Sequence, residues 1–256
     1  MILLLVVIFI KQLTKKLTVG TMKIVIQDTW TEEDDLELLE YVEKNHELVT
    51  LSEEELLKIT DVNEYGCIFC DSVILQQILK NIYTVNQCYP ECFAKLYNRN
   101  IKVMNSNELY GLTKPFFVKP YSNDKTVDSS IINTNSDIDY IEKNIKVYTS
   151  SICNFINEYR IFVSNKEVYS IVDSSSFIMD NPVFMDCPKD FIEEIVTLNI
   201  YDFCVIDIGF DKLIKKWSVV EVNPPFSLSS YDLDIRKYFE YCVNAYSYIT
   251  NKKTNK

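Results

Sequence analysis

The sequence WSVVEVNPP at residues 217–225 constrains the fold of this chain more than any other segment. Its β-branched residues predict a buried strand, and its two prolines predict the strand's end, because proline donates no backbone hydrogen bond. Side chains alternate along a strand, so Glu221 and Asn223 would share one face, with Val220 and Val222 packed on the other. A carboxylate and an amide oxygen side by side suit a hard cation such as magnesium. The alternative is a half-exposed polar face, which the surrounding valines disfavour.

The composition excludes several functional classes. The chain has 256 residues, 47% of them hydrophobic, enough for one large domain or two small ones. A formal net charge of -11 argues against a broad nucleic-acid surface, although a local basic site for phosphate stays compatible. The four glycines form neither GxGxxG nor a P-loop. The one histidine, His46, rules out a histidine-based triad, and its polar neighbours predict a solvated position.

Two cysteine pairs have spacings that resemble zinc ligands. They are Cys67 with Cys70 and Cys88 with Cys92. On the strand predicted for residues 66–70, positions three apart face opposite sides, which is poor geometry for chelation. We therefore expect ordinary buried thiols and not a structural zinc site. This cysteine usage is typical of a cytoplasmic protein.

The first 21 residues form a leader that differs from the rest of the chain. Residues 1–10 are continuously apolar, but a membrane span needs about 20. Lysines follow the apolar run where a signal peptide would have them before it, and no small-residue cleavage site follows. We expect residues 1–21 to be a start-codon extension or a disordered leader. A weak membrane-associating tail is the alternative.

Two patterns divide the remaining sequence into an α/β part and an α+β part. Residues 22–110 alternate strands and helices, which predicts a small parallel sheet with helix caps at Thr31, Ser52 and Ser72 and strands at 23–27, 48–51 and 66–70. Residues 111–250 predict helices at 188–198 and 231–249 and strands at 115–119, 146–149, 152–163, 167–172, 203–209 and 217–223. We expect a loop at residues 135–137 and a frayed tail at 251–256.

Three further segments carry side chains that suit phosphate or cation binding. The strand FFVKP contains Lys119, either a point charge for a phosphate or a surface lysine. In NEYRIFV, Glu158 and Arg160 share a face, either as an ion pair or as an arginine fork for phosphate or carboxylate. In VIDIG, Asp207 lies between isoleucines and is costly to bury unless paired or bound to a metal. A position at a turn near Gly209 is the alternative for this aspartate.

In this order the segments resemble the ATP-grasp superfamily. The matching elements are VKP, Glu158 with Arg160, Asp207 with Gly209, and VEVN. The sequence EVNPPFSLSSY is most similar to a viral and bacterial clade named for an arginine and two lysines. The resemblance covers residues 111–250 and implies an ATP-grasp fold, preceded at 22–110 by a small βα parallel-sheet domain.

The resemblance also implies roles for particular residues, with ATP between two α+β subdomains. Lys119 would contact the ATP phosphates, and Lys125 is the implied second lysine. Arg160 would stabilise the transferred phosphate or the substrate carboxylate, with Glu158 beside it among the nucleotide-binding residues. The implied magnesium ligands are Asp207, Glu221 and Asn223, and the implied hinge that reads adenine through its backbone includes Ser150, Ser151 and Ile152.

The implied function is an ATP- and magnesium-dependent carboxylate–amine ligase that forms an acylphosphate on an amino acid, peptide or protein. The loop at 121–130 departs from the pattern, because it has no glycine to let backbone approach phosphate. A nucleotide-binding regulatory protein without turnover is therefore the main alternative, followed by a kinase-like phosphotransferase and by an unrelated α/β protein. The Asn-, Lys-, Ile- and Tyr-rich composition indicates AT-rich coding DNA, as in a virus or its host. The oligomeric state stays open.

Overall fold

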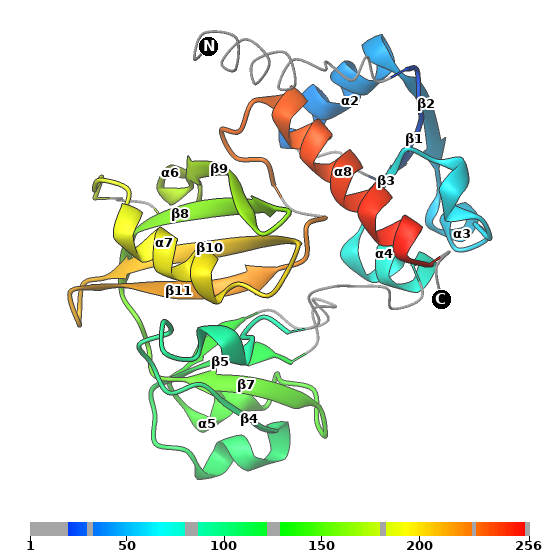
Figure 1. The fold of residues 1–256 in the computed structure, drawn as a ribbon. Helices are drawn as coiled ribbons and strands as arrows, with labels where there is room; N and C mark the ends of the chain where they lie inside the picture. The colour runs from blue at the N-terminus through cyan, green and yellow to red at the C-terminus, as the bar shows by residue number, and fades with distance from the viewer. Residues whose placement is uncertain are drawn as a thin grey trace, which may run out of the picture.

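The computed structural model describes residues 20–29, 33–79, 87–121, 129–179, 183–226 and 229–253. The expected leader up to residue 19, the expected cap at Thr31 and the implied second lysine, Lys125, lie outside these residues. The described chain forms a mixed α/β structure with one parallel and two antiparallel sheets (Figure 1). This arrangement confirms the predicted fold class.

The first sheet is parallel, with strand order β2-β1-β3. Its strands are β1 (Lys23–Gln27), β2 (Glu47–Leu51) and β3 (Cys67–Phe69), and its helices are α2 (Glu33–Asn45), α3 (Glu53–Leu56) and α4 (Ser72–Ile78). Ser52 caps α3 as predicted, in a capping box with Glu55. The cap of α4 is Asp71, whose carboxylate accepts from the Val73 amide at 2.7 Å. The predicted cap at Ser72 was wrong by one residue, because Ser72 is already inside the helix.

The second sheet is antiparallel, with strand order β4-β7-β5-β6. Its strands are β4 (Lys102–Asn105), β5 (Phe116–Pro120), β6 (Ser130–Ile132) and β7 (Lys146–Ser150). The short strands β4 and β6 were not predicted. The loop expected at 135–137 is instead a helical turn, α5 (Asn135–Ile138). Asp137 stabilises this turn by accepting from the amides of Asn133 and Thr134, both at 2.8 Å.

The third sheet is also antiparallel, with strand order β11-β10-β8-β9. Its strands are β8 (Phe155–Ser164), β9 (Glu167–Asp173), β10 (Phe203–Asp211) and β11 (Lys216–Asn223). The short helix α6 (Ser175–Ile178) follows β9, and α7 (Lys189–Leu198) lies across one face of the sheet (Figure 1). Ile192 and Ile195 of α7 pack into the core on that face.

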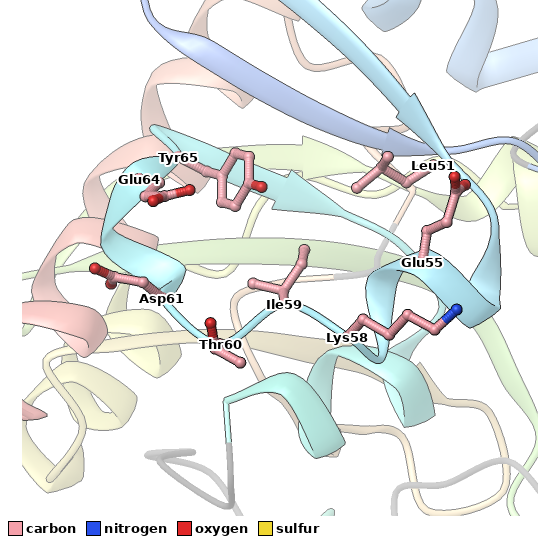
Figure 2. Close-up of a pocket in the computed structure, with 8 residues that line it drawn as sticks. All are labelled: Leu51, Glu55, Lys58, Ile59, Thr60, Asp61, Glu64 and Tyr65. Carbon is pink, nitrogen blue, oxygen red and sulfur yellow. The ribbon is translucent and has the colours of Figure 1, made fainter.

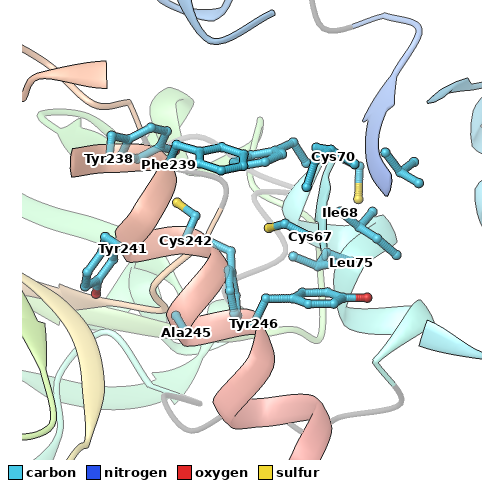
Figure 3. Packing of buried hydrophobic residues seen from close by; sticks show 14 of the residues in the cluster. Cys67, Ile68, Cys70, Leu75, Tyr238, Phe239, Tyr241, Cys242, Ala245 and Tyr246 are labelled. Carbon is cyan, nitrogen blue, oxygen red and sulfur yellow. The ribbon is translucent and has the colours of Figure 1, made fainter. Parts of the chain in front are cut away.

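The last helix, α8 (Ile235–Lys253), returns to the first sheet and packs against β3 and α2 (Figure 1). Figure 3 shows its aromatic and thiol side chains beside those of β3 and α4. The same core includes Phe162 and Val205 of the third sheet, so α8 joins the first sheet to the third. The helix runs to Lys253, into the segment expected to be frayed. The division of the chain at residue 110 stays a prediction.

His46 is not solvated, which corrects the prediction from its polar neighbours. Its ring stacks on Phe239 of α8, with centroids 4.7 Å apart and planes 19° apart. Burial lowers the pKa of the imidazole, so its neutral form is favoured. The prediction failed because the helix that covers His46 comes from the other end of the chain.

Candidate active site

The two faces of the third sheet differ in chemistry. The face beneath α7 is apolar, with Ile161, Val163, Cys204, Ile206, Ile208, Val219 and Val222 in one buried cluster. The opposite face is divided along the strands. Its apolar end carries Phe162 and Val205, which pack with α8. The other end of this face carries the charged side chains singled out from the sequence.

Opposite charges meet in one row across this end of the sheet. The register places Arg160 of β8 beside Asp207 of β10, and Asp207 beside Glu221 of β11. Arg160 donates from Nε to Asp207 Oδ1 at 2.8 Å and from Nη2 to Oδ2 at 2.9 Å, and both residues are buried. The ion-pair partner of Arg160 is thus Asp207 on the neighbouring strand, and not Glu158 on its own strand. Asp207 lies within β10 and not at a turn.

Lys119 connects this row to the second sheet. It extends from β5 and forms an ion pair with Glu221, and the two side chains are only 20% and 23% exposed. Burial alone would lower the pKa of Lys119, but the Glu221 carboxylate raises it above its usual value. Lys119 in turn holds the pKa of Glu221 below its usual value despite burial. Lys119 is therefore not a solvated surface lysine, and two sheets meet at this ion pair.

Asn223 completes a group of three oxygen-bearing side chains. Its Nδ2 donates to Asp207 Oδ2 and to Glu221 Oε1, both at 3.0 Å. The partly positive amide nitrogen thus lies between two carboxylates, at a point where a cation would be attracted. Oxygen donors of this kind fit magnesium. In the described ranges, no three His, Cys, Asp or Glu residues form a metal site by themselves, so the amide is needed.

The strand β11 is not the regular strand that the sequence predicted. Val222 packs beneath α7 as expected, but the second valine in that core is Val219 and not Val220. The register with β10 shifts between Asp207 and Ile208, which marks a β-bulge. The bulge turns Glu221 and Asn223 to the same face as Asp207.

Gly209, two residues after Asp207, allows a close approach beside the site. A Cβ atom at this position would lie 2.6 Å from Phe155 Cδ1 and 3.1 Å from Val220 Cγ2. Any larger residue would therefore displace the Phe155 ring or the strand. The glycine that sequence analysis placed with Asp207 has a steric role in the structure.

Glu158 lies near the charged row, two residues before Arg160 on β8. Burial, together with the nearby Asp207 and Glu221 carboxylates, raises the pKa of Glu158 to about 8. Its backbone is held by Ser175 of α6, which accepts from the Glu158 amide at 2.8 Å and donates to its carbonyl at 3.1 Å. Ser175 was not singled out from the sequence, because the contact depends on how the chain turns after β9.

Arg160 has partners beyond Asp207. Its Nη1 donates to the Ser229 carbonyl at 3.1 Å, and its Cζ lies 4.4 Å from the centre of the Tyr231 ring. Tyr231 in turn contacts Phe177 of α6, with ring centroids 5.1 Å apart. The implied phosphate contact of Arg160 stays a prediction, since its described donors already bind protein groups.

The implied hinge lies where the second sheet joins the third. Ser150 is the last residue of β7, pairs with Phe117 of β5, and donates from Oγ to the Ser151 carbonyl at 2.9 Å. Ser151 and Ile152 belong to the short connection between β7 and β8. This placement fits a hinge, and the reading of adenine by its backbone stays a prediction.

A segment between residues 87 and 99 also lines the site, and no sequence motif had indicated it. Cys88 lies near Lys119 and Glu221, and burial raises the pKa of its thiol to about 11, so it stays protonated at neutral pH. Arg99 of the same segment donates to carbonyl oxygens of β11. Cys67 and Cys70, by contrast, are buried in the core of the first sheet, as expected for ordinary thiols.

A hollow of about 330 Å³ lies apart from this site, in the N-terminal unit (Figure 2). Its lining includes Leu51, Ile59 and Tyr65, with charged residues around them. Two of the charged residues already serve as helix caps, Glu55 for α3 and Asp61 for the 3₁₀ helix that follows it. In the part of the chain that the structure describes, no helix is long and apolar enough to cross a membrane.

The fold and the charged site together define an ATP-grasp protein, and comparison with known families establishes this. Residues 96–241 match the family model of an ATP-grasp domain, family 2 of the clade named for an arginine and two lysines. The match spans more than half of the sequence, so the chain belongs to this family. It confirms the predicted superfamily and the predicted class, an ATP-dependent ligase of the ATP-grasp type. No curated protein matches the chain in sequence.

Solved structures agree on the fold. The chain is similar to D-alanine–D-alanine ligase from Bacillus anthracis complexed with ATP, with TM-score 0.55, 11% identity, and 91% of this chain and 99% of that chain covered. It is similar to N5-carboxyaminoimidazole ribonucleotide synthetase from Thermotoga maritima, with TM-score 0.52, 13% identity, and 86% and 76% covered. A RimK domain ATP-grasp protein from Sphaerobacter thermophilus gives TM-score 0.53, 10% identity, and 90% and 98% covered. At these identities the likeness concerns the fold alone.

Proposed function

We propose that the protein is an ATP- and magnesium-dependent carboxylate–amine ligase whose acceptor is an amino acid, a peptide or a protein. The observation that carries this proposal is the ion pair between Lys119 of the second sheet and Glu221 of the third. It brings a cation suited to phosphate into contact with the oxygen-bearing group of Asp207, Glu221 and Asn223. A nucleotide between the two sheets would meet both.

The proposed reaction has two steps. A carboxylate oxygen of the first substrate attacks the γ-phosphorus of ATP, the bond from that phosphorus to the β–γ bridging oxygen breaks, and ADP leaves. The amine nitrogen of the second substrate then attacks the acyl carbon, the bond to the phosphate oxygen breaks, and phosphate and a proton are released. Such transfers need positioning and charge neutralisation more than covalent help from the protein. This agrees with a site that has no histidine.

The metal-binding role falls to Asp207, Glu221 and Asn223. Magnesium, when bound, would neutralise charge on the phosphate oxygens and orient the transferred group. Arg160 holds Asp207 in place through two hydrogen bonds, and Lys119 supplies the cation that faces the phosphates. Lys125 is the proposed second lysine.

The remaining roles concern the nucleotide and the acceptor. Ser150, Ser151 and Ile152 are proposed to contact adenine through their backbone, and Glu158 to contact the nucleotide. For the acceptor, the support comes from Phe177 of α6, which is 46% exposed and contacts the ring that covers Arg160. An exposed aromatic residue beside the charged row would favour an acceptor with apolar groups.

The test is an ADP-release assay with pools of amino acids and peptides, with and without magnesium. We expect magnesium-dependent ADP release with at least one pool, and a loss of about 100-fold in Glu221→Ala, since the site stabilises the transition state by charge. Glu54→Gln is the matched control, because Glu54 is an exposed carboxylate of α3. ATP binding without ADP release from any pool would contradict the ligase.

One observation favours a second candidate, a nucleotide-binding protein without turnover. The sequence YSNDKTVDSS at 121–130 has no glycine, where close backbone approach to phosphate would use one. The same assay separates the two candidates, because only the ligase consumes the amine. ADP release without amine consumption would instead indicate a phosphotransferase.

A further inference from the structure

The β-bulge in β11 has an effect on the site that a regular strand would not have. The register pairs Asp207 with Glu221 and Ile208 with Val219, so Val220 is the extra residue of β11. Val219 and Val222 both lie in the core beneath α7. Residues three apart on a regular strand face opposite sides, so only the bulge lets both valines pack there.

The same bulge decides where the oxygen-bearing side chains point. On a regular strand, Glu221 and Asn223 would share the face of Val219 and would lie in the apolar core. The extra residue transfers both to the face of Asp207. Without the bulge, packing of Val219 and the grouping of Asp207, Glu221 and Asn223 would exclude each other.

Arg99 binds the backbone of the bulge. Its Nη1 donates to the Val219 carbonyl at 2.9 Å, and its Nη2 donates to the Val220 carbonyl at 2.6 Å. Consecutive carbonyls of a regular strand point to opposite edges, and here both reach one guanidinium. The planar fork of arginine suits two adjacent acceptors, which a lysine ammonium would not match. The guanidinium also lies 5.4 Å from the Tyr89 ring centre and 5.8 Å from that of Phe155.

The segment that carries Arg99 also pairs with the outer edge of β11. The Val219 amide donates to the Leu96 carbonyl and the Val222 amide to the Cys88 carbonyl, both at 2.9 Å. These two amides are three residues apart and point to the same edge, which again requires the extra residue. Asn98 binds the same edge outside the bulge, by donating to the Trp217 carbonyl at 2.9 Å.

We propose that Arg99 is a positioning residue for the metal site, because it fixes the bulge that turns Glu221 and Asn223 toward Asp207. The proposal rests on the proposed function, in which these three residues hold magnesium. Arg99 acts through the β11 backbone and touches no reacting atom. Residues that orient metal ligands in this way typically change metal affinity by about 10- to 100-fold when they are replaced.

The test compares Arg99→Lys with Asn98→Ala in the full chain. Binding of Mn²⁺, a paramagnetic probe for magnesium sites, is titrated by electron paramagnetic resonance, and thermal unfolding is followed in parallel. We expect Mn²⁺ affinity to fall about tenfold or more in Arg99→Lys and less than twofold in Asn98→Ala. A merely structural role would lower the unfolding temperature of both variants and leave Mn²⁺ affinity unchanged. Wild-type affinity in a folded Arg99→Lys would overturn the proposal.

A crystal structure of Arg99→Met separates this proposal from the proposed function. We expect the register between β10 and β11 to lose the extra residue, with Glu221 turned from Asp207. A bulge unchanged at Val220 would overturn the proposal, whether or not the protein binds metal. If wild-type protein binds no Mn²⁺, the proposed function fails, and the metal-positioning role of Arg99 fails with it. If the variant does not crystallise, faster hydrogen exchange at the Val219 and Val222 amides than in Asn98→Ala is the expected result, and equal exchange overturns the proposal.

Discussion

The two faces of the third sheet come from the same strands and are stabilised in different ways. One face buries Ile206 and Ile208 beneath α7, and such burial stabilises the fold by about 25 cal/mol per Å² of apolar surface. The other face buries Arg160 and Asp207 and half-buries Glu221, and desolvation of these groups is costly unless each charge is paired. Stability explains the first set of residues. The second set is explained by what it can bind, since apolar residues would serve stability as well.

The largest expected effect is on the polar face, when one charge of a buried pair is removed. In metal-free protein, Arg160→Met or Asp207→Leu leaves its partner buried without its ion pair, and we expect the free energy of unfolding to fall by about 3–5 kcal/mol. The double variant removes both charges and should be more stable than either single variant. Denaturant unfolding of the four proteins measures this. A double variant as unstable as the sum of the singles would break the comparison.

The apolar face should respond differently to a substitution. Ile206→Ala removes buried methyl groups and leaves a cavity, so we expect a loss of about 2–5 kcal/mol in the free energy of unfolding. Ile206→Val is the matched control, with an expected loss of about 0.5–1.5 kcal/mol. Neither variant should change ATP affinity, measured by calorimetry at a temperature where both are folded. A tenfold loss of ATP affinity in either would show that the faces are not independent.

Gly209 tests the boundary between packing and site. The added Cβ in Gly209→Ala would meet the Phe155 ring, so we expect a loss of about 1–3 kcal/mol from overpacking. Gly111→Ala is the control, because a Cβ there has no atom within 4 Å. Thermal unfolding distinguishes the two variants. Equal effects would mean that the close approach at Gly209 is unimportant.

The sequence predicted the members of the polar face but not how they are held. Alternation along a strand is a local property, so Lys119, Asp207, Glu221 and Asn223 could be singled out and the structure brings them together. The bulge depends on Arg99, which is far from β11 in the sequence. No local pattern encodes such a contact.

The same limit explains the errors in the fold. The stacking of His46 on Phe239 and the return of α8 to the first sheet join opposite ends of the chain. The strands β4 and β6 are short and were missed because their partners, β7 and β5, define them. Long buried strands with strong alternation were predicted closely.

The smallest expected effect is a pH dependence at the polar face. The folded protein raises the pKa of Glu158 to about 8, so it favours the protonated carboxyl. Stability from this group is complete below the ordinary pKa of 4.5 and is lost as the pH rises through about 8. Because solvent reaches this half-buried group, we expect a change on the order of 1 kcal/mol. Unfolding of metal-free protein from pH 5 to 9 measures it, and Glu158→Gln should remove the slope; an unchanged slope would contradict the assignment.

The central claim is that the polar face of the third sheet binds ATP together with magnesium. Calorimetric titration of ATP into wild type and Glu221→Gln, each with magnesium or with EDTA, tests it most directly. We predict that magnesium strengthens ATP binding to wild type by about 10-fold or more and loses this effect in the variant. Wild-type protein that binds no ATP, or a variant that keeps the full effect of magnesium, would contradict the claim.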